Sequence, residues 1–210
     1  MDEELIDKIY REVPLEKIPW VYKEPPALLV ELINKGKIRP CRTLELGCGI
    51  GNYAIYLATK SFEVTGIDFS PKAIELAKQK ANKMNVNCEF FVADVTGDLS
   101  EVKGNFDFIF DWELLHHIFP EKRKFFLKTV YNLLKPGGIY LTVSFDEKDP
   151  SFGGVGKYRK TPMGTLLYFS SEYELEKLFT SYFEIEVLKK IEIRGKPVPH
   201  IANYGLMKRS

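Results

Sequence analysis

The sequence has few cysteines, little net charge and no long apolar run. Its three cysteines, Cys41, Cys48 and Cys88, are an odd number without a C-x-x-C pair, which disfavours a disulfide framework and favours a reducing cytoplasm. A net charge of +1 gives no bulk attraction to nucleic acid or to an anionic membrane. No apolar run reaches membrane-spanning length, and the opening M-D-E-E does not resemble a secretory signal. No spacing of cysteine and histidine resembles a metal site. We therefore expect a cytoplasmic protein without a membrane partner or a metal.

Strand and helix patterns alternate along the chain. This alternation predicts an α/β fold, with helices on both faces of a mostly parallel sheet. The predicted strands are 42–46, 63–67, 88–92, 106–110, 138–145, 182–193 and 201–208. The clearest predicted helices are 71–84 and 120–134, and another begins near Ser171. The segment 147–169 is predicted to be a loop rich in glycine and proline. At 210 residues, the chain is expected to form one domain.

The most informative segment is 43–52, T-L-E-L-G-C-G-I-G-N, a short apolar strand that leads into a loop. Gly47, Gly49 and Gly51 allow positive φ and close approach of a ligand. The helix after the loop presents free N–H groups to the same crevice. Asp68 ends the next strand about 20 residues later, where a carboxylate can accept both hydroxyls of a ribose. The pattern predicts a site for a nucleotide-type cofactor.

The glycine spacing and Glu45 narrow the choice of cofactor. Dinucleotide-binding loops have the spacing G-x-G-x-x-G, whereas this loop has G-x-G-x-G after a carboxylate. Glu45 would repel a pyrophosphate and suits a cofactor with a positive charge and an amino group. The pattern resembles motif I of the class I S-adenosylmethionine-dependent methyltransferases. A nicotinamide-dependent oxidoreductase is the nearest alternative with a related fold, and the spacing and Glu45 disfavour it.

Further motifs extend this resemblance over residues 40–146. Asp68 and Asp94 each end a strand, Asp111 ends a third strand, and 133–141 reads L-L-K-P-G-G-I-Y-L. The resemblance implies a Rossmann-like seven-stranded sheet with an antiparallel closing strand and a helical N-terminal cap. It assigns Asp68 to the ribose and Asp94 to the adenine amino group. The full set of expected cofactor contacts is Trp20, Glu45, Gly47, Cys48, Gly49, Gly51, Asn52, Asp68, Phe69, Asp94, Val95 and Asp111.

The roles of this set also follow from the resemblance. Glu45 orders the loop and the amino end of the cofactor, and Phe69 and Val95 enclose the adenine ring. Asp111 lies near the methionine part, which it contacts through its backbone. The segment 18–22, I-P-W-V-Y, is similar to an N-terminal Pro-Trp segment of the thiopurine and tellurite-resistance-like methyltransferases, which covers the bound cofactor. The chain then divides into a cap (1–40), a cofactor-binding core (41–146), a substrate-side loop (147–170) and a closing helix with strands (171–210).

Candidates for the acceptor side follow the fourth strand, at 112–118, W-E-L-L-H-H-I. His116 or His117 could serve as a base. The alternative is that one histidine packs against the cofactor or the strand end while the other faces solvent. The segment lacks the Asn/Asp-Pro-Pro-aromatic motif of the enzymes that methylate nucleic-acid amino groups. The expected substrate pocket consists of Tyr22, Trp112, His116 and Tyr158.

The loop 152–160, F-G-G-V-G-K-Y-R-K, is either a lid over the acceptor or an ordinary solvated loop. Its basic residues either bind an anion or simply face water. The sequence as a whole predicts methyl transfer from S-adenosylmethionine to a small-molecule nucleophile by in-line displacement. The alternatives are an RNA or protein methyltransferase and a non-catalytic S-adenosylmethionine-binding partner protein. The acceptor atom, the need for a base, and the choice between monomer and homodimer stay open.

Overall fold

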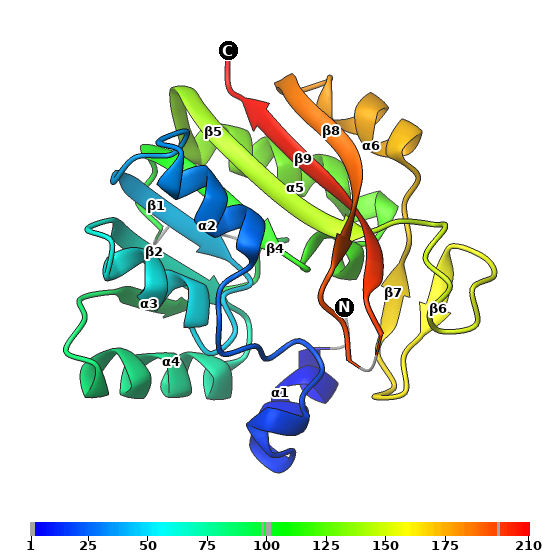
Figure 1. Ribbon diagram of the computed structural model, residues 1–210, viewed down its shortest axis with the longest axis horizontal. Coiled ribbons are helices and arrows are strands. Elements are labelled where there is room, and N and C mark those ends of the chain that lie inside the picture. The colour runs from blue at the N-terminus through cyan, green and yellow to red at the C-terminus, as the bar shows by residue number, and fades with distance from the viewer. Residues whose placement is uncertain (1–2, 98, 100–101, 197) are drawn as a thin grey trace.

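A computed structural model of the chain describes residues 3–97, 99, 102–196 and 198–210 (Figure 1). Its main sheet has seven strands in the order β3-β2-β1-β4-β5-β9-β8. The first five strands along the chain are parallel, β9 is antiparallel to β5, and β8 is antiparallel to β9. The bounds are β1 Arg42–Leu46, β2 Glu63–Asp68, β3 Glu89–Val92, β4 Phe106–Trp112, β5 Leu134–Phe145, β8 Glu184–Ile193 and β9 His200–Lys208. The predicted Rossmann-like sheet with an antiparallel closing strand is confirmed.

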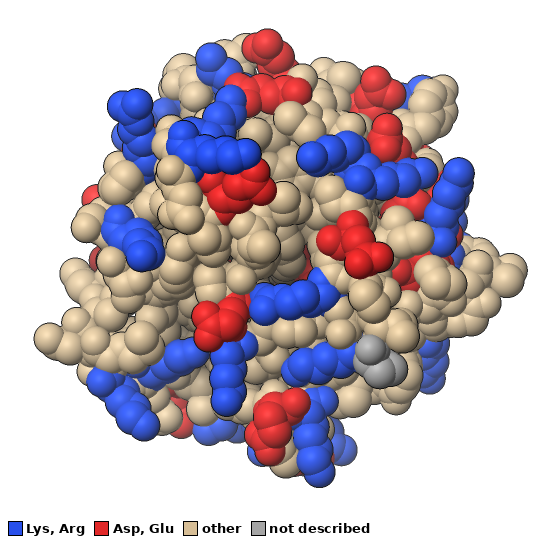
Figure 2. Space-filling view, viewed as in Figure 1, with Lys and Arg blue, Asp and Glu red and all other residues tan. Residues whose placement is uncertain are grey.

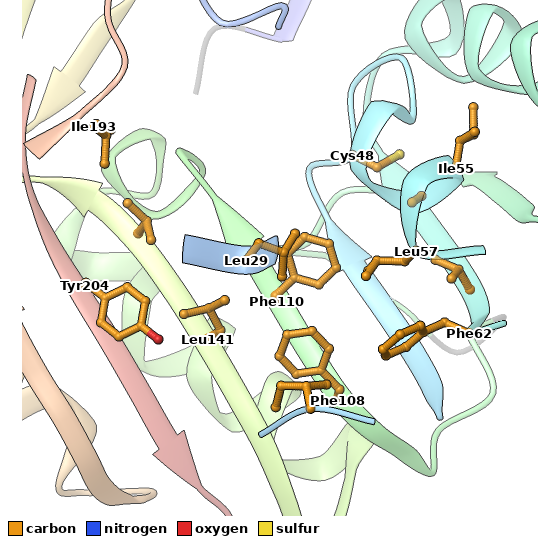
Figure 3. Packing of buried hydrophobic residues seen from close by; sticks show 14 of the residues in the cluster. Leu29, Cys48, Ile55, Leu57, Phe62, Phe108, Phe110, Leu141, Ile193 and Tyr204 are labelled. Carbon is orange, nitrogen blue, oxygen red and sulfur yellow. The ribbon is translucent and has the colours of Figure 1, made fainter. Parts of the chain in front are cut away.

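Helices cover both faces of this sheet, as predicted. The helices α2 (Ala27–Asn34), α3 (Asn52–Ala58) and α4 (Pro71–Lys83) lie in front in Figure 1, and α5 (Pro120–Leu133) and α6 (Glu172–Phe179) lie behind. Buried residues form a core layer on each face. In Figure 3, Phe108 and Phe110 of β4 occupy the front layer, near Leu29 of α2 and Leu57 of α3. Residues of β4 fill both layers, so this strand is central to the fold. No described helix has the length and apolar character needed to cross a membrane.

The N-terminal segment forms the helical cap. The helix α1 (Glu3–Glu12), a short 3₁₀ turn η1 (Leu15–Lys17) and α2 precede the sheet. Ile6, Ile9 and Tyr10 of α1 form a separate small core with Ile50 of the glycine loop and Ala73 of α4. The cap is therefore packed directly over the segment that the sequence marks as the cofactor site.

The region 147–169 contains more structure than the predicted loop. Two short strands, β6 (Tyr158–Lys160) and β7 (Leu166–Tyr168), form an antiparallel hairpin there. Arg159 is buried and donates hydrogen bonds to the carbonyl oxygens of Glu147, Asp149, Ser151 and Gly156. Its guanidinium also lies 4.1 Å from the centre of the Phe169 ring. A side chain that satisfies so many carbonyl groups fixes the conformation of this region. Strand periodicity does not reveal such side-chain contacts to the backbone.

Smaller differences concern element boundaries. The strand β5 begins at Leu134 rather than at 138, and its register against β4 shifts between Phe106 and Phe108. The turn glycine Gly137 has φ +78° within this segment. The closing helix begins after Ser171, whose side chain and that of Glu174 form a reciprocal capping box. A 3₁₀ turn η2 (Leu115–His117) follows β4. All of these lie within a few residues of the predicted positions.

Candidate active site

The first candidate pocket lies at the carboxyl ends of β1, β2 and β4. These ends are level, because Leu46 pairs with Ile67 on one side and with Asp111 on the other. The pocket encloses about 740 Å³, part of it open to solvent. We call it the glycine-loop pocket. Its lining residues are Ile6, Tyr10, Trp20, Val21, Tyr22, Glu45, Gly47, Cys48, Gly49, Ile50, Asn52, Tyr53, Asp68, Phe69, Trp112, Glu113, Leu114 and His117.

The three loop glycines all have positive φ, at +68°, +52° and +72° for Gly47, Gly49 and Gly51. A Cβ on Gly49 would lie 2.8 Å from the Tyr10 hydroxyl. Gly49 therefore permits both the backbone turn and the close approach of α1. Gly51 does not line the pocket, since a Cβ there would lie 2.7 Å from the Phe90 ring. Its absent side chain instead lets α3 begin against β3.

Asp68 ties this loop to the end of β2. Its carboxylate accepts hydrogen bonds from the backbone N–H of Gly49 and of Ser70, each at 2.9 Å. Burial raises the pKa of Asp68 to about 6, although the two N–H groups oppose the rise. The side chain is 6% exposed and lines the pocket, so it could accept further hydrogen bonds from a bound hydroxyl.

Glu45 supplies a second buried carboxylate. It is 3% exposed, and its Oε2 has no hydrogen-bond partner in the described part of the chain. Burial raises the pKa of Glu45 well above its usual range. An orphaned carboxylate oxygen in a pocket wall is costly unless a ligand satisfies it. A cationic amino group of a ligand would do so, as expected for a cofactor that carries an α-amino group.

Three further predicted residues line the same pocket. Cys48 is buried, with its sulfur 3.7 Å from the Gly49 carbonyl oxygen. Asn52 donates to the Tyr22 carbonyl oxygen at 2.5 Å and accepts from the Lys80 ammonium. Phe69 follows Asp68 directly and belongs to the wall. Asn52 thus joins the glycine loop to the N-terminal segment rather than presenting a free amide.

Other predicted cofactor contacts lie outside the lining. Asp94 accepts hydrogen bonds from the N–H of Thr96 at 2.8 Å and from its hydroxyl at 2.9 Å. Val95 is buried in the core layer on the α5 side of the sheet. Asp111 is fully buried and accepts from the Tyr140 hydroxyl at 2.6 Å and from the N–H of Leu115 at 3.2 Å. Asp111 directly precedes the lining residue Trp112, whereas Asp94 and Val95 follow β3, which has no residue in the lining.

The cap closes the glycine-loop pocket through two contacts. The indole N–H of Trp20 donates to the Tyr10 hydroxyl at 2.9 Å. Asp7 accepts from the Ser70 hydroxyl at 2.6 Å and from the N–H of Lys72 at 3.1 Å. The second contact joins α1 to the N-terminus of α4, where a carboxylate is favoured.

Replacing Asp7 by alanine is expected to loosen this cover. The lost hydrogen bonds should reduce the free energy of unfolding by about 1–2 kcal/mol and weaken S-adenosylmethionine binding by about fivefold. Chemical denaturation and calorimetry measure the two effects. Lys8→Ala is the control, because Lys8 lies on the same helix and pairs with Glu12 at 3.9 Å, where both side chains are 64% exposed. Equal losses of stability and affinity in both variants would contradict the role of Asp7 in holding α1 against α4.

A second pocket adjoins the first and encloses about 820 Å³, part of it open to solvent. We call it the aromatic pocket. Its lining residues are Pro19, Trp20, Tyr22, Glu113, His116, His117, Phe145, Phe152, Thr161, Pro162, Met163, Thr165, Leu167, Lys196 and His200. Six of them come from the substrate-side region 147–170. The two pockets share Trp20, Tyr22, Glu113 and His117.

The two histidines differ in their surroundings. His116 is 2% exposed and stacks on Phe145 at 4.1 Å, while the N–H of Phe145 donates to its Nδ1 at 3.3 Å. Burial lowers the pKa of His116 well below its usual range. His117 lines both pockets, and burial lowers its pKa to about 4. Both rings are therefore neutral near pH 7, and His116 is engaged in packing.

Tyr158 does not lie in either pocket, in contrast to Tyr22, Trp112 and His116. It is half-exposed, and its ring contacts those of Phe119 and Tyr168. The neighbouring Lys157 lies 2.5 Å from a carboxylate oxygen of Glu174. With Arg159 bound to loop carbonyls, these two basic residues already have partners. Lys157 and Arg159 therefore have a structural role, and Lys160 is the exposed basic residue of this cluster.

Sequence reasoning missed Glu113. It lines both pockets, and its backbone has φ +66°, an uncommon value for a residue other than glycine. Burial raises the pKa of Glu113 to about 8. Glu113 stands in the segment W-E-L-L-H-H, whose histidines are the more usual general bases. The only available signal was its position directly after the end of a central strand.

Comparison with known proteins bears on these two pockets. A family model described as a methyltransferase domain matches residues 43–138, which include the glycine loop and β1 to the start of β5. The chain belongs to the class I S-adenosylmethionine-dependent methyltransferases. The strand order and the glycine loop agree with this membership.

Two curated relatives illustrate the range of this family. The chain is 30% identical to the 2-heptyl-1-hydroxyquinolin-4(1H)-one methyltransferase of Mycobacteroides abscessus, with 69% of the chain and 65% of that protein covered. It is 31% identical to the tRNA N(3)-methylcytidine methyltransferase Mettl2 of Drosophila melanogaster, with 77% and 54% covered. The chain thus spans between about half and two thirds of the length of these relatives.

One solved structure has the same fold over nearly the whole chain. It is the 1,6-didemethyltoxoflavin-N1-methyltransferase of Burkholderia thailandensis, with bound 1,6-didemethyltoxoflavin and S-adenosylhomocysteine. Its TM-score is 0.76 at 19% identity, with 99% of this chain and 87% of that chain covered. At this identity the likeness concerns the fold of the methyltransferase.

Proposed function

We propose that this methyltransferase transfers a methyl group from S-adenosylmethionine to a small molecule held in the aromatic pocket. The observation that carries the proposal is the shared wall of the two pockets, formed by Trp20, Tyr22, Glu113 and His117. When bound, S-adenosylmethionine supplies a methyl group already activated by its sulfonium. The chain then has to hold two molecules in contact and exclude water, and good alignment alone contributes ~7–11 kcal/mol to such reactions.

The residues of the glycine-loop pocket fit this cofactor. Glu45 would meet its cationic amino group and Asp68 its ribose hydroxyls, while Gly49 leaves room for close approach. The fold relative that holds S-adenosylhomocysteine supports the same choice. Asp94, Val95 and Asp111 stay predictions from the family resemblance, because their side chains do not line the pocket.

A small, largely aromatic acceptor is favoured by the second pocket. Its walls are mostly rings and aliphatic side chains, among them Phe145, Phe152 and Met163. The relatives named for a hydroxyquinolinone and for didemethyltoxoflavin act on compact heterocycles, which supports this acceptor class. We propose that the region 147–170 forms the substrate side of the enzyme. The three cysteines are free thiols, and a cytoplasmic location is part of the proposal.

RNA methylation is the second candidate, because one relative is a tRNA methyltransferase. A nucleic-acid surface generally concentrates lysine and arginine on one face. On the face in Figure 2, Lys and Arg are interspersed with Asp and Glu, and the net charge of the chain is +1. These observations favour the small molecule over RNA.

The test is to incubate the purified protein with S-adenosylmethionine labelled in its methyl group. Separate reactions contain aromatic hydroxy and amino compounds, thiols, and unmodified tRNA. We expect label in at least one compact aromatic compound and none in tRNA. Transfer to tRNA would overturn the small-molecule proposal, and tight binding without transfer to any acceptor would favour the non-catalytic alternative.

A further inference from the structure

The wall between the two pockets contains one carboxylate whose role has not been assigned. Of the four shared residues, Trp20 donates its N–H to Tyr10, and Tyr22 donates its hydroxyl to the Arg194 carbonyl oxygen at 3.2 Å. The side chains of Glu113 and His117 form no hydrogen bond within the described part of the chain. They are therefore the shared residues with polar atoms available to a ligand. With a pKa of about 4, His117 is the weaker base of the two.

The backbone holds Glu113 in an unfavourable conformation at this place. Its φ of +66° is costly for a residue with a Cβ, and such strain is found mainly at functional sites. The N–H of Glu113 donates to the carbonyl oxygen of Val143 at 2.8 Å, which ties the residue to β5. A glycine would relieve the strain, so the presence of a carboxylate indicates a use for it.

Among the described residues, no ion pair involves the Glu113 carboxyl group. The Arg194 guanidinium donates to the Glu24 carbonyl oxygen at 2.5 Å and lies over the Tyr22 ring. The positive charge of Arg194 lowers the pKa of Glu113, but burial raises it by more. The resulting pKa is about 8. At pH 7 a group with this pKa is about nine-tenths protonated. The other titratable groups that line pockets with Glu113 are Tyr10, Tyr22, Glu45, Cys48, Tyr53, Asp68, His116, His117, Glu192, Lys196 and His200.

We propose that Glu113 is the proton-accepting residue of this enzyme and that it ionises when a cation occupies the adjoining glycine-loop pocket. The inference rests on the proposed function, because the cation is the sulfonium of the cofactor. A positive charge nearby favours the ionised form of a carboxyl group. A protonated Glu113 then releases its proton to solvent, so that the site holds a carboxylate only when it is loaded.

The proton balance defines the acceptor class. The acceptor is an aromatic compound with a weakly acidic O–H or N–H group. Its lone pair forms the new bond to the methyl carbon, the electrons of the broken carbon–sulfur bond stay on sulfur, and its proton passes to Glu113. After product release, Glu113 is again the neutral acid of the empty site.

The test is calorimetric and needs no acceptor. S-adenosylmethionine and S-adenosylhomocysteine are titrated into the protein at pH 7 in buffers of different ionisation enthalpy, which gives the number of protons released. Both ligands carry the same amino group and ribose, so the difference between them isolates the sulfonium. We expect S-adenosylmethionine to release about 0.8 more protons than S-adenosylhomocysteine. The difference should vanish in Glu113→Gln and persist in Glu192→Gln, a β8 carboxylate that lines neither of the two pockets.

The outcomes separate the inference from the proposed function. An equal proton release for the two ligands in the wild type, or an undiminished difference in Glu113→Gln, would overturn the role of Glu113. If neither ligand binds, the proposed function fails and the inference fails with it.

A second measurement needs no ligand. Because the pKa of folded Glu113 is raised, its favourable contribution to stability is complete below about pH 4.5 and is lost as the pH rises through about 8. Glu113→Gln has no charge to bury. It should therefore melt at least about 4 °C above the wild type at pH 8.5, with a smaller difference at pH 5. A melting difference that is independent of pH would contradict a raised pKa of the carboxyl group at this position.

Discussion

Replacing Gly49 by valine is expected to lower the affinity for S-adenosylmethionine by at least about a hundredfold. Two effects combine at this position. The backbone has φ +52°, which a β-branched residue adopts only with strain of ~1–3 kcal/mol. A Cβ would also lie 2.8 Å from the Tyr10 hydroxyl, so that α1 or the loop has to move. Either movement disturbs the hydrogen bond between the N–H of Gly49 and Asp68, and with it the pocket wall.

Gly36→Val is the matched control for this variant. Gly36 also has a positive φ, +69°, but no atom lies within 4 Å of the position of its Cβ. It follows α2 on the exposed surface and lines neither pocket. The control should lose only the stability that the backbone strain costs, and it should keep its affinity for the ligand. Similar affinities of the two variants in calorimetry would show that close approach at Gly49 is not needed.

Replacing Asp68 by alanine is expected to weaken S-adenosylmethionine binding by tenfold or more. A hydrogen bond to a buried charged group contributes ~1.5–3 kcal/mol, which corresponds to about a tenfold to hundredfold change in affinity. The variant also loses the two hydrogen bonds that fix Gly49 and Ser70. Calorimetric titration measures the change, and Asp68→Asn should fall between alanine and the wild type because its amide oxygen still accepts.

Glu63→Gln is the control for Asp68→Ala. Glu63 begins the same strand, β2, at its exposed end, where it pairs with Arg42 at 3.3 Å. An exposed ion pair contributes little to stability, and the residue is remote from the carboxyl end of the strand. Unchanged affinity in Asp68→Ala would mean that this carboxylate does not contact the cofactor.

The fold was largely predictable from the sequence because its signals are local and periodic. The strand 42–46 and the helix begun by Ser70 and Pro71 were recognised from apolar pattern and capping residues, and the structure has them at the same places. The positive φ of Gly47 and Gly49 was predictable as well, because glycine is the only residue type that adopts it freely. These features depend on neighbours in the chain, which a sequence displays.

The contents of the site were less predictable because they depend on contacts between distant segments. The presence of Tyr10 in the pocket follows from the docking of α1 on α4 through Asp7, 63 residues from Ser70. The side chain of Asp111 likewise depends on a distant partner, because it accepts a hydrogen bond from Tyr140, 29 residues away. The sequence could not predict the strained backbone of Glu113. A positive φ can be expected from sequence only at glycine and asparagine, which adopt it more readily than other residues.

Direct binding tests the central claim, that the glycine-loop pocket is a site for S-adenosylmethionine. The purified protein is titrated calorimetrically with S-adenosylmethionine, S-adenosylhomocysteine and NADH under the same conditions. We predict micromolar binding of both adenosyl ligands and none of NADH, since Glu45 lies where a pyrophosphate would be repelled. Binding of NADH alone would contradict the assignment of the pocket and the interpretation of the glycine spacing from which it began.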